Sequence, residues 1–171
     1  NLNLTINSGV YGLLGVNGAG KTTLMRMICT LLPPTSGQIL CDGKDIFQMD
    51  GEYRNLLGYL PQEFGFYPDF TVKDYLMYIA SLKGIRPMVA GKRVKELLEQ
   101  VGLTKAANKK MKKLSGGMKR RTGIAQAMLN NPKILILDEP TAGLDPSERV
   151  RFRNLISELS EERIVILSTH I

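Results

Sequence analysis

The chain has 171 residues, of which 43% are hydrophobic and 23% charged, and its 23 basic and 16 acidic residues give a net charge of +7. This length suits one domain with a substantial core. The longer apolar runs, at 134–137 and 164–167, are far too short to span a bilayer, and residues 1–8 do not resemble a signal peptide. Cys29 and Cys41 lack the spacing of metal ligands. We expect free thiols in a reducing compartment, with a disulfide as the alternative.

Much of the positive charge falls in one region of the sequence. The basic residues there are Lys105, Lys109, Lys110, Lys112, Lys113, Lys119, Arg120 and Arg121. A basic surplus can indicate a nucleic acid, a membrane surface or an anionic ligand, but such a run is more often a solvated face. No aromatic residues are interleaved with it, which argues against binding by base stacking. We therefore expect no nucleic-acid partner.

The first elements are two strands and a helix. Residues 2–6 alternate apolar and polar side chains, which predicts a half-buried, antiparallel strand. A turn at 8–9 leads into residues 10–14, which predict a short buried strand. A helix is expected over 21–31, where the prolines at 33–34 stop it. The segment between the second strand and the helix is therefore a loop at a helix N-terminus.

That loop fits the pattern G-x-x-x-x-G-K-[ST], known as Walker A. Its residues are Gly15, Val16, Asn17, Gly18, Ala19, Gly20, Lys21, Thr22 and Thr23. The glycines lack the Cβ atoms that would stop the backbone from curling around an anion with its N–H groups turned inward. Lys21 supplies a compact positive charge for the outer phosphates, and the Thr22 hydroxyl can ligate Mg²⁺. Because donors and dipole at a helix N-terminus also favour phosphate, we predict a nucleotide phosphate site here.

The next segment changes from strands to helices. Residues 37–41 predict a strand ended by a turn at 42–43, and pairing of the short strands would form a small antiparallel patch. Residues 56–61 predict another strand, which leads directly to Gln62. From there to about residue 129 the spacing of apolar residues is helical.

Three helices are expected in that block. Residues 72–82 have helical spacing, and a second stripe at 94–101 follows interruptions at Pro87 and Gly91. A third helix should begin near Gly117 and stop before the Asn-Pro pair that follows it. These stripes predict core packing rather than a binding surface.

Two acids follow the next strand. Residues 134–137 are an unbroken apolar run, typical of a strand buried on both faces, and Asp138 and Glu139 come directly after it. Adjacent acids at a strand end can divide two roles, one holding Mg²⁺ and the other polarising an attacking water. Alone, such a pair is weak evidence for a site, and solvated surface acids are the default interpretation.

The chain closes with a capped helix and a last strand. Asp145 can cap a helix, Pro146 suits its first turn, and Glu148 can reach back to the cap. Residues 164–167 predict the last buried strand, and His170, the only histidine, lies just past it. By itself this histidine is best read as a polar residue at a strand end.

Residues 114–118, Leu-Ser-Gly-Gly-Met, give these motifs a common context. Here the chain closely resembles the nucleotide-binding domain of ATP-binding cassette (ABC) proteins, whose signature is Leu-Ser-Gly-Gly-Gln. Five further elements match in the same order along the chain. They are the Walker A loop, the Q-loop glutamine Gln62, the Walker B pair Asp138 and Glu139, the D-loop Gly143-Leu144-Asp145 and the switch histidine His170.

The resemblance implies an α/β fold: a P-loop NTPase core with a mainly parallel sheet, a small antiparallel β patch and an inserted helical subdomain. It implies one ABC ATPase domain over 1–171, with the core at 1–62 and 130–171 and the helical subdomain at about 63–129. The domain is expected to be cut short at both ends. The aromatic residue that stacks on adenine in this family belongs upstream of Asn1, and we expect Tyr11 to be a core residue.

The resemblance also implies site roles, with ATP and Mg²⁺ as cofactors. The phosphates are held by Gly15, Asn17, Gly18, Ala19, Gly20, Lys21, Thr22 and Thr23. Mg²⁺ is arranged by Thr22, Gln62 and Asp138. Glu139 is the general base and His170 senses the γ-phosphate, so Lys21, Glu139 and His170 form the catalytic set.

The signature implies a second copy of the domain. Ser115 and the amides of Gly116 and Gly117 form another anion cradle at a helix N-terminus. In the family, two domains pack head to tail, so the signature of one covers ATP bound to the other, and Asp145 communicates across the dimer. Met118 departs from the family glutamine, which is expected to alter packing at the helix start.

The leading functional hypothesis is the ATPase subunit of an ABC transporter, cytoplasmic and peripheral on the inner face of the membrane beside transmembrane permease subunits. Residues 59–68 resemble the Q-loop region of bacterial exporters, and Phe64, Phe66, Tyr67 and Phe70 either receive a coupling helix or pack the loop. The alternatives are a soluble ABC ATPase of translation or DNA repair, and a nucleotide-binding fragment that does not turn over.

Overall fold

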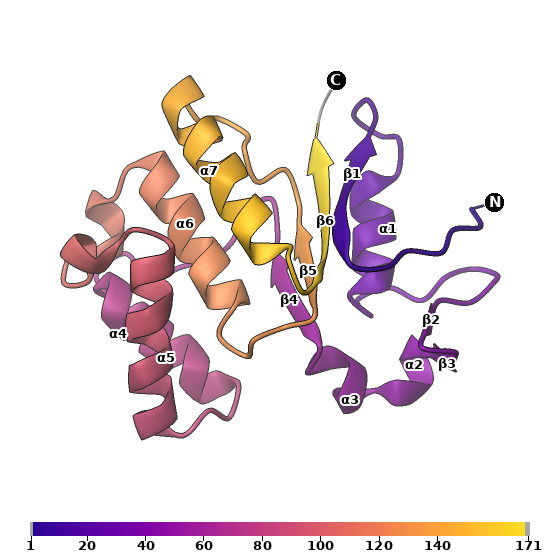
Figure 1. Cartoon of the computed structure of the whole chain (residues 1–171), viewed down its shortest axis with the longest axis horizontal. Coiled ribbons are helices and arrows are strands. Elements are labelled where there is room, and N and C mark those ends of the chain that lie inside the picture. The colour runs from indigo at the N-terminus through magenta and orange to yellow at the C-terminus, as the bar shows by residue number, and fades with distance from the viewer. Residues whose placement is uncertain (1, 170–171) are drawn as a thin grey trace.

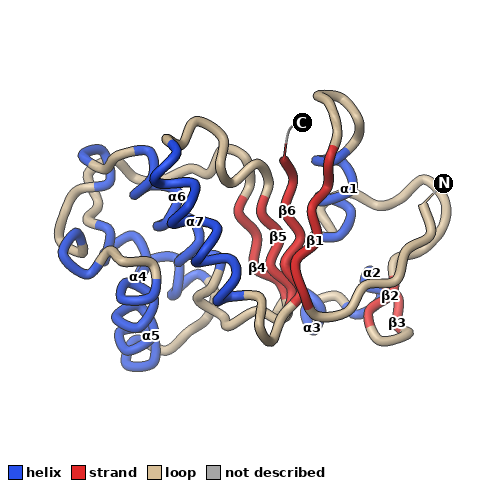
Figure 2. Tube along the Cα trace, turned by 45° about the horizontal axis from the view of Figure 1, so that its top comes forward, coloured by secondary structure: helices blue, strands red, loops and turns tan. Residues whose placement is uncertain are grey.

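A computed structural model describes residues 2–169, and its centre is a parallel four-stranded sheet in the order β1-β6-β5-β4 (Figures 1 and 2). The strands are β1 (Gly9–Leu14), β4 (Leu57–Leu60), β5 (Ile134–Leu137) and β6 (Ile164–Thr169). Leu137 pairs with Leu60 on one side and Leu167 on the other, so the carboxyl ends of these strands meet at one edge. The predicted parallel α/β core is confirmed.

Helices cover both faces of the sheet (Figure 2). On one side lies α1 (Lys21–Ile28), and on the other lie α6 (Gly116–Ala127) and α7 (Pro146–Leu159). Alternate residues of β5 belong to two separate apolar cores, Leu135 to the core with α6 and α7 and Ile136 to the core with α1. The unbroken apolar run of β5 therefore has the predicted cause, burial on both faces.

The helical block is built by α4 (Val72–Leu82), α5 (Pro87–Gln100) and α6, joined through short 3₁₀ turns at Thr104–Ala106 and Met111–Lys113. A break between the two predicted stripes is present, because α4 ends at Leu82 and α5 begins at Pro87. The expectation that Gly91 also interrupts the helical spacing is wrong, because Gly91 lies inside α5. Proline at the first helical position removes no intrahelical hydrogen bond, and one interior glycine costs only about 1 kcal/mol.

The antiparallel patch is a hairpin of β2 (Leu40–Cys41) and β3 (Lys44–Asp45), followed by the single turns α2 (Ile46–Met49) and α3 (Gly51–Arg54). Asp42 and Gly43 have φ angles of 48° and 79°, as a two-residue hairpin turn requires. The predicted turn is confirmed, but the strand is shorter than expected.

Two expectations for the N-terminal segment are wrong. Residues 2–6 form no strand, and Leu2 and Leu4 are 66% and 69% exposed, because no described strand pairs with them. The strand β1 is not buried on both faces: Val10 and Leu14 are 47% and 67% exposed, since the core around α6 and α7 does not extend to them. Tyr11 is half-buried and packs against the apolar core around α1, in keeping with its predicted core role, and its hydroxyl accepts a hydrogen bond from the N–H of Asn7 at 3.1 Å.

Cys29 is buried and Cys41 half-buried, and both are free thiols, as expected. Among the described residues, no helix has the length and apolar character needed to cross a bilayer.

Candidate functional site

The Walker A loop connects β1 to α1, as the sequence predicts. Gly18 and Gly20 have φ angles of 83° and 91°, which glycine adopts without a steric penalty. A Cβ atom at Gly15 would lie 3.1 Å from Cβ of Ala19, so the loop curls tightly there. Within residues 2–169, no side chain caps α1, and its first N–H groups remain available for an anion. Asn17 lies exposed in the loop, and Thr22 and Thr23 in the first turn of the helix.

Lys21 folds back into the loop that precedes it. Its Nζ donates hydrogen bonds to the carbonyl oxygens of Gly15 and Val16, the second at 3.1 Å. Among the described residues no carboxylate forms an ion pair with Lys21. The ammonium group therefore stands inside the loop with its charge available to an anionic ligand.

A continuous chain of hydrogen bonds links this loop to the two acids after β5. Thr22 Oγ1 donates to Asp138 Oδ2 at 3.0 Å, and Ser168 Oγ donates to Asp138 Oδ1 at 2.6 Å. The N–H of Glu139 donates to Ser168 Oγ at 2.7 Å. Asp138 is 1% exposed and Ser168 is fully buried, so these bonds lie in a region from which water is largely excluded. Segments far apart in sequence thus meet at the carboxyl edge of the sheet.

Glu139 is held in an unusual backbone conformation beside the Q-loop. Its φ angle is 46°, in the left-handed region that costs a non-glycine residue about 1–2 kcal/mol. Gln62 Nε2 donates to Glu139 Oε2 at 3.1 Å, so the Q-loop amide orients the carboxylate. Backbone strain of this kind, together with an oriented side chain, is typical of functional sites.

The donor set around Asp138 fits Mg²⁺. A threonine hydroxyl and a carboxylate are hard oxygen ligands, and Mg²⁺ takes most of its other ligands from phosphates and waters. Within the described part of the chain, no three His, Cys, Asp or Glu side chains cluster to hold a metal ion.

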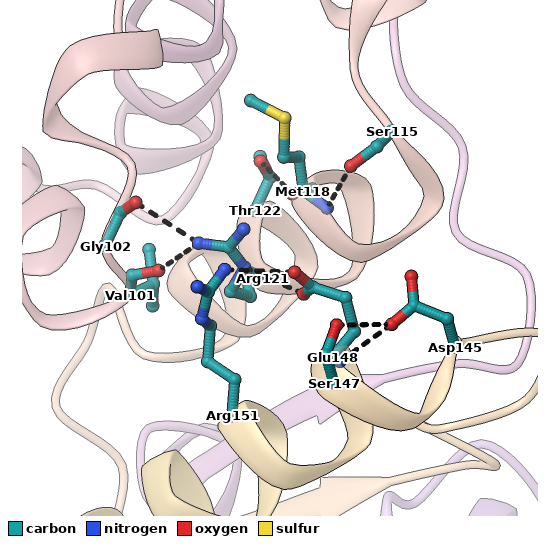
Figure 3. A network of polar contacts seen from close by, with 10 residues as sticks. All are labelled: Val101, Gly102, Ser115, Met118, Arg121, Thr122, Asp145, Ser147, Glu148 and Arg151. Atoms are coloured by element: carbon teal, nitrogen blue, oxygen red, sulfur yellow. Dashed lines mark hydrogen bonds and ion pairs between the residues drawn. The ribbon is translucent and has the colours of Figure 1, made fainter.

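The signature residues lie at the N-terminus of α6, as predicted (Figure 3). Ser115 caps this helix, because its Oγ accepts a hydrogen bond from the N–H of Met118 at 3.2 Å. Ser115 and Gly116 are exposed and Gly117 is buried. Met118 packs its side chain against the apolar core, which is how the structure accommodates it at the position of the family glutamine.

Asp145 caps α7 as predicted, accepting from the N–H of Glu148 at 2.9 Å. The carboxylate of Glu148 does not return to this cap. It pairs with Arg151 Nη1 at 3.0 Å and lies 3.5 Å from Nε of Arg121 (Figure 3). The first turn of α7 is therefore linked to the signature helix.

The basic run divides into two kinds of residue. Its lysines from 105 to 113 are exposed, in keeping with a solvated face, but Arg121 is only 7% exposed. Arg120 is half-buried, and burial lowers its pKa while Glu139, Asp138 and Glu63 act in the opposite direction.

Sequence reasoning missed the roles of Ser168, Glu148 and Arg121. For Arg121 a signal was present, since it stands three and four positions before Ile124 and Ala125, which are buried in α6. For Ser168 and Glu148 the partners come from distant segments. His170 lies outside the described residues, so its predicted role stays a prediction.

Known proteins match this chain over nearly its whole length. The family model for ABC transporters matches residues 1–142. The bacitracin transport ATP-binding protein BcrA of Bacillus licheniformis is 43% identical over 173 residues, which cover 99% of this chain and 56% of that protein. The Nod factor export ATP-binding protein I of Burkholderia lata is 40% identical over 171 residues, with coverages of 99% and 56%.

A solved structure agrees with the fold. The structure of cbiO1 from Clostridium perfringens, described as part of the ABC transporter complex cbiONQ, has a TM-score of 0.86 and 33% identity, and covers 99% of this chain and 70% of that one. The chain spans about half the length of the curated relatives it matches. The ordered motifs, the parallel sheet that brings them together and these matches show that this chain belongs to the ABC transporter family.

Proposed function

We propose that this chain binds and hydrolyses ATP as the ATPase part of an ABC transporter, powering export through membrane partner subunits. The observation that carries the proposal is the buried chain of hydrogen bonds from Thr22 through Asp138 and Ser168 to the N–H of Glu139. It fastens a phosphate loop to a metal-binding carboxylate and a candidate base, which is the set of parts that phosphoryl transfer to water needs.

Each part has a role in this proposal. Lys21 and the loop amides hold the phosphates, and Thr22, Gln62 and Asp138 hold Mg²⁺, which would neutralise phosphate charge. Glu139 accepts a proton from the attacking water as the general base. Gln62, through its hydrogen bond to Glu139, keeps that carboxylate directed into the site. His170 senses the γ-phosphate.

A second ABC ATPase domain completes the site. The phosphate loop leads into α1 on one side of the sheet, whereas the signature turn belongs to α6 on the other side (Figure 1). This separation supports a head-to-tail dimer, in which Ser115, Gly116 and Gly117 of one copy cover the triphosphate held by the other. Because γ-phosphate contacts exist only in the closed state, ATP favours closure and hydrolysis permits opening.

An exposed aromatic cluster supports a membrane subunit as the further partner. Tyr67, Phe70 and Tyr78 have ring centroids 4.9–5.9 Å apart and are 36–49% exposed. Phe64 and Phe66 instead pack against the apolar core. Of the aromatic residues around the Q-loop, we therefore assign docking of a permease segment to Tyr67 and Phe70, extended by Tyr78, and loop packing to the other two. Such docking would hold the chain on the inner face of the membrane.

The names of the relatives support the transporter and the direction. One is a bacitracin transport ATP-binding protein and another a Nod factor export ATP-binding protein. We extend export to this chain on that basis.

The test is the variant Glu139→Gln in the full-length protein. We expect it to bind ATP normally, to lose at least about a hundredfold in hydrolysis, the usual contribution of a general base, and to accumulate as a dimer with Mg-ATP. Nucleotide titration, phosphate release and light scattering measure the three properties. Lys21→Ala is the control, because it should lose ATP binding and the dimer together. Near-normal hydrolysis by Glu139→Gln would remove Glu139 from the role of base.

A further inference from the structure

Arg121 joins three helices at one buried point (Figure 3). From its position on α6, its Nη1 donates to the carbonyl oxygens of Val101 at 3.0 Å and Gly102 at 3.2 Å, at the C-terminal end of α5. Its Nε lies 3.5 Å from Oε2 of Glu148, in the first turn of α7. Carbonyl groups at a helix C-terminus favour a cation, and Glu148 supplies the opposite charge. Arg121 therefore fastens α6 to both α5 and α7.

The side chain of Glu148 also touches the signature turn. A Cβ atom at Gly117 would lie 2.6 Å from Cδ and 2.8 Å from Cγ of Glu148. The side chain of Glu148 therefore rests on the first turn of α6 at Gly117, and a Cβ atom there would force it to move. A carboxylate near the N-terminus of a helix is favoured by the positive end of the helix dipole.

The backbone of Glu148 is tied to the D-loop. Asp145 Oδ1 accepts from the N–H of Glu148 at 2.9 Å and from Ser147 Oγ at 2.8 Å. Arg151 Nη1 binds the remaining carboxylate oxygen of Glu148 at 3.0 Å, from a side chain that is 61% exposed. Glu148 is thus held by Asp145 through its main chain and by Arg121 and Gly117 through its side chain.

We propose that Glu148, paired with Arg121, is a positioning residue that keeps the signature turn and Asp145 in one fixed relation, so that both reach the neighbouring copy's nucleotide together. This inference rests on the proposed function, because it takes the signature turn to close over a triphosphate held by a second domain. The two attachments of Glu148 lead to the two elements that this closure brings to the partner.

The test compares Glu148→Gln with its parent, both carrying Glu139→Gln in the full-length protein. We expect the dissociation constant of the Mg-ATP dimer to rise by about tenfold or more, because the signature turn and Asp145 would no longer be held in one relation when they meet the partner's nucleotide; a tenfold change corresponds to about 1.4 kcal/mol. The affinity of the monomer for ATP, which the P-loop sets, should change by less than about twofold, a change worth under half a kcal/mol. Light scattering over a protein dilution series and nucleotide titration measure the two constants.

Two further variants separate positioning from folding. Arg151→Gln removes the other, exposed partner of the same carboxylate and should change the dimer constant by less than about twofold. In a double-mutant cycle, Arg121→Met with Glu148→Gln should be no weaker in dimerisation than Arg121→Met alone, because the second change removes a contact already lost.

Several results would overturn the inference. One is a Glu148→Gln dimer as tight as its parent's, and another is a parallel loss of thermal stability, ATP affinity and dimerisation, which would assign Glu148 a structural role only. A parent that binds ATP without dimerising would overturn the proposed clamp and this inference with it. If the parent dimerises and Glu148→Gln dimerises equally tightly, this inference is overturned and the proposed function is not.

Discussion

The phosphate loop and the signature turn are anchored in different ways. The loop is attached to the parallel sheet by the hydrogen bonds of Asp138 with Thr22 and Ser168. Asp138 and Ser168 are almost fully buried. The signature turn rests on helices, with Ser115 and Gly116 exposed and with Glu148 and Arg121 as its polar attachment to α7. This difference suits the proposed function, in which the loop holds phosphate and metal on a rigid support and the signature turn closes and opens as a cap with few attachments.

Removing the Ser168 hydroxyl, which supports the phosphate loop from the sheet, should lower stability more than the other substitutions below. In Ser168→Ala the N–H of Glu139 and Oδ1 of Asp138 both lose a partner in a buried region. Since each such loss costs about 1–3 kcal/mol, we expect unfolding free energy to fall by at least about 2 kcal/mol, with reduced hydrolysis. Urea unfolding and phosphate release measure both.

Ser160→Ala is the matched control, because Ser160 donates only to the carbonyl of Ser157 near the surface. It should change stability by less than about 0.5 kcal/mol. A small effect of Ser168→Ala would mean that the sheet side is no more firmly built than the signature side.

A methyl group at Gly117 should lower stability less than Ser168→Ala does. It should weaken closure of the dimer without weakening ATP binding by the monomer. It would collide with the side chain of Glu148, which can swing away only by leaving Arg121. We expect Gly117→Ala to lower stability by about 1–2 kcal/mol, at the low end for overpacking because the displaced group is flexible. Dimerisation with Mg-ATP should weaken while ATP binding by the monomer is retained.

The neighbouring glycine gives the control for that experiment. A Cβ atom at Gly116 has no atom within 4 Å, so Gly116→Ala should leave thermal stability unchanged within the monomer. Equal losses of stability in the two variants would contradict the contact between Glu148 and the signature turn.

The smallest expected effect concerns Cys29, which caps the C-terminal end of α1. Burial, and after it the charge of Asp138, raise the pKa of the Cys29 thiol from its ordinary 9.0 to about 12. The folded state therefore keeps this proton at pH values where the unfolded state has lost it. The contribution of the Cys29 thiol to the free energy of unfolding is fully present below pH 9 and is lost as the pH rises toward 12. Between pH 9 and 10 we expect the free energy of unfolding to fall by about 1 kcal/mol.

Urea unfolding at pH 8, 9 and 10 measures this slope. Cys29→Ala should lose that part of it, whereas Cys41→Ala, at a half-buried position, should keep it. An unchanged slope in Cys29→Ala would show that its thiol is not the group that titrates.

The sheet and the phosphate loop were predictable because their signals are local. Apolar runs specify β5 and β6, and glycine spacing specifies the loop before Lys21. The failures lie where distant segments decide. The alternating residues 2–6 cannot form a strand without the edge of another strand to pair with. The residues next to Ser168 in the sequence give no indication of its hydrogen bonds to Asp138 and Glu139.

Charge misled the interpretation of the helical block for a related reason. Arg121 stands in a run of basic residues, yet it lies in a stretch of α6, residues 121–125, that is buried throughout, and carbonyls at the end of α5 and the acid of α7 replace water around it. Local composition was therefore a poor guide to its burial. The aromatic residues around the Q-loop divided similarly, with two packed inside and two at the surface.

The left-handed backbone at Glu139 has a consequence for the sequences this position can accept. Glycine would fit that conformation without steric cost, but it carries no carboxylate. The protein therefore keeps its acid at a place where folding alone would choose a residue without a side chain. Substitutions at position 139 that raise thermal stability should accordingly lower the rate of hydrolysis.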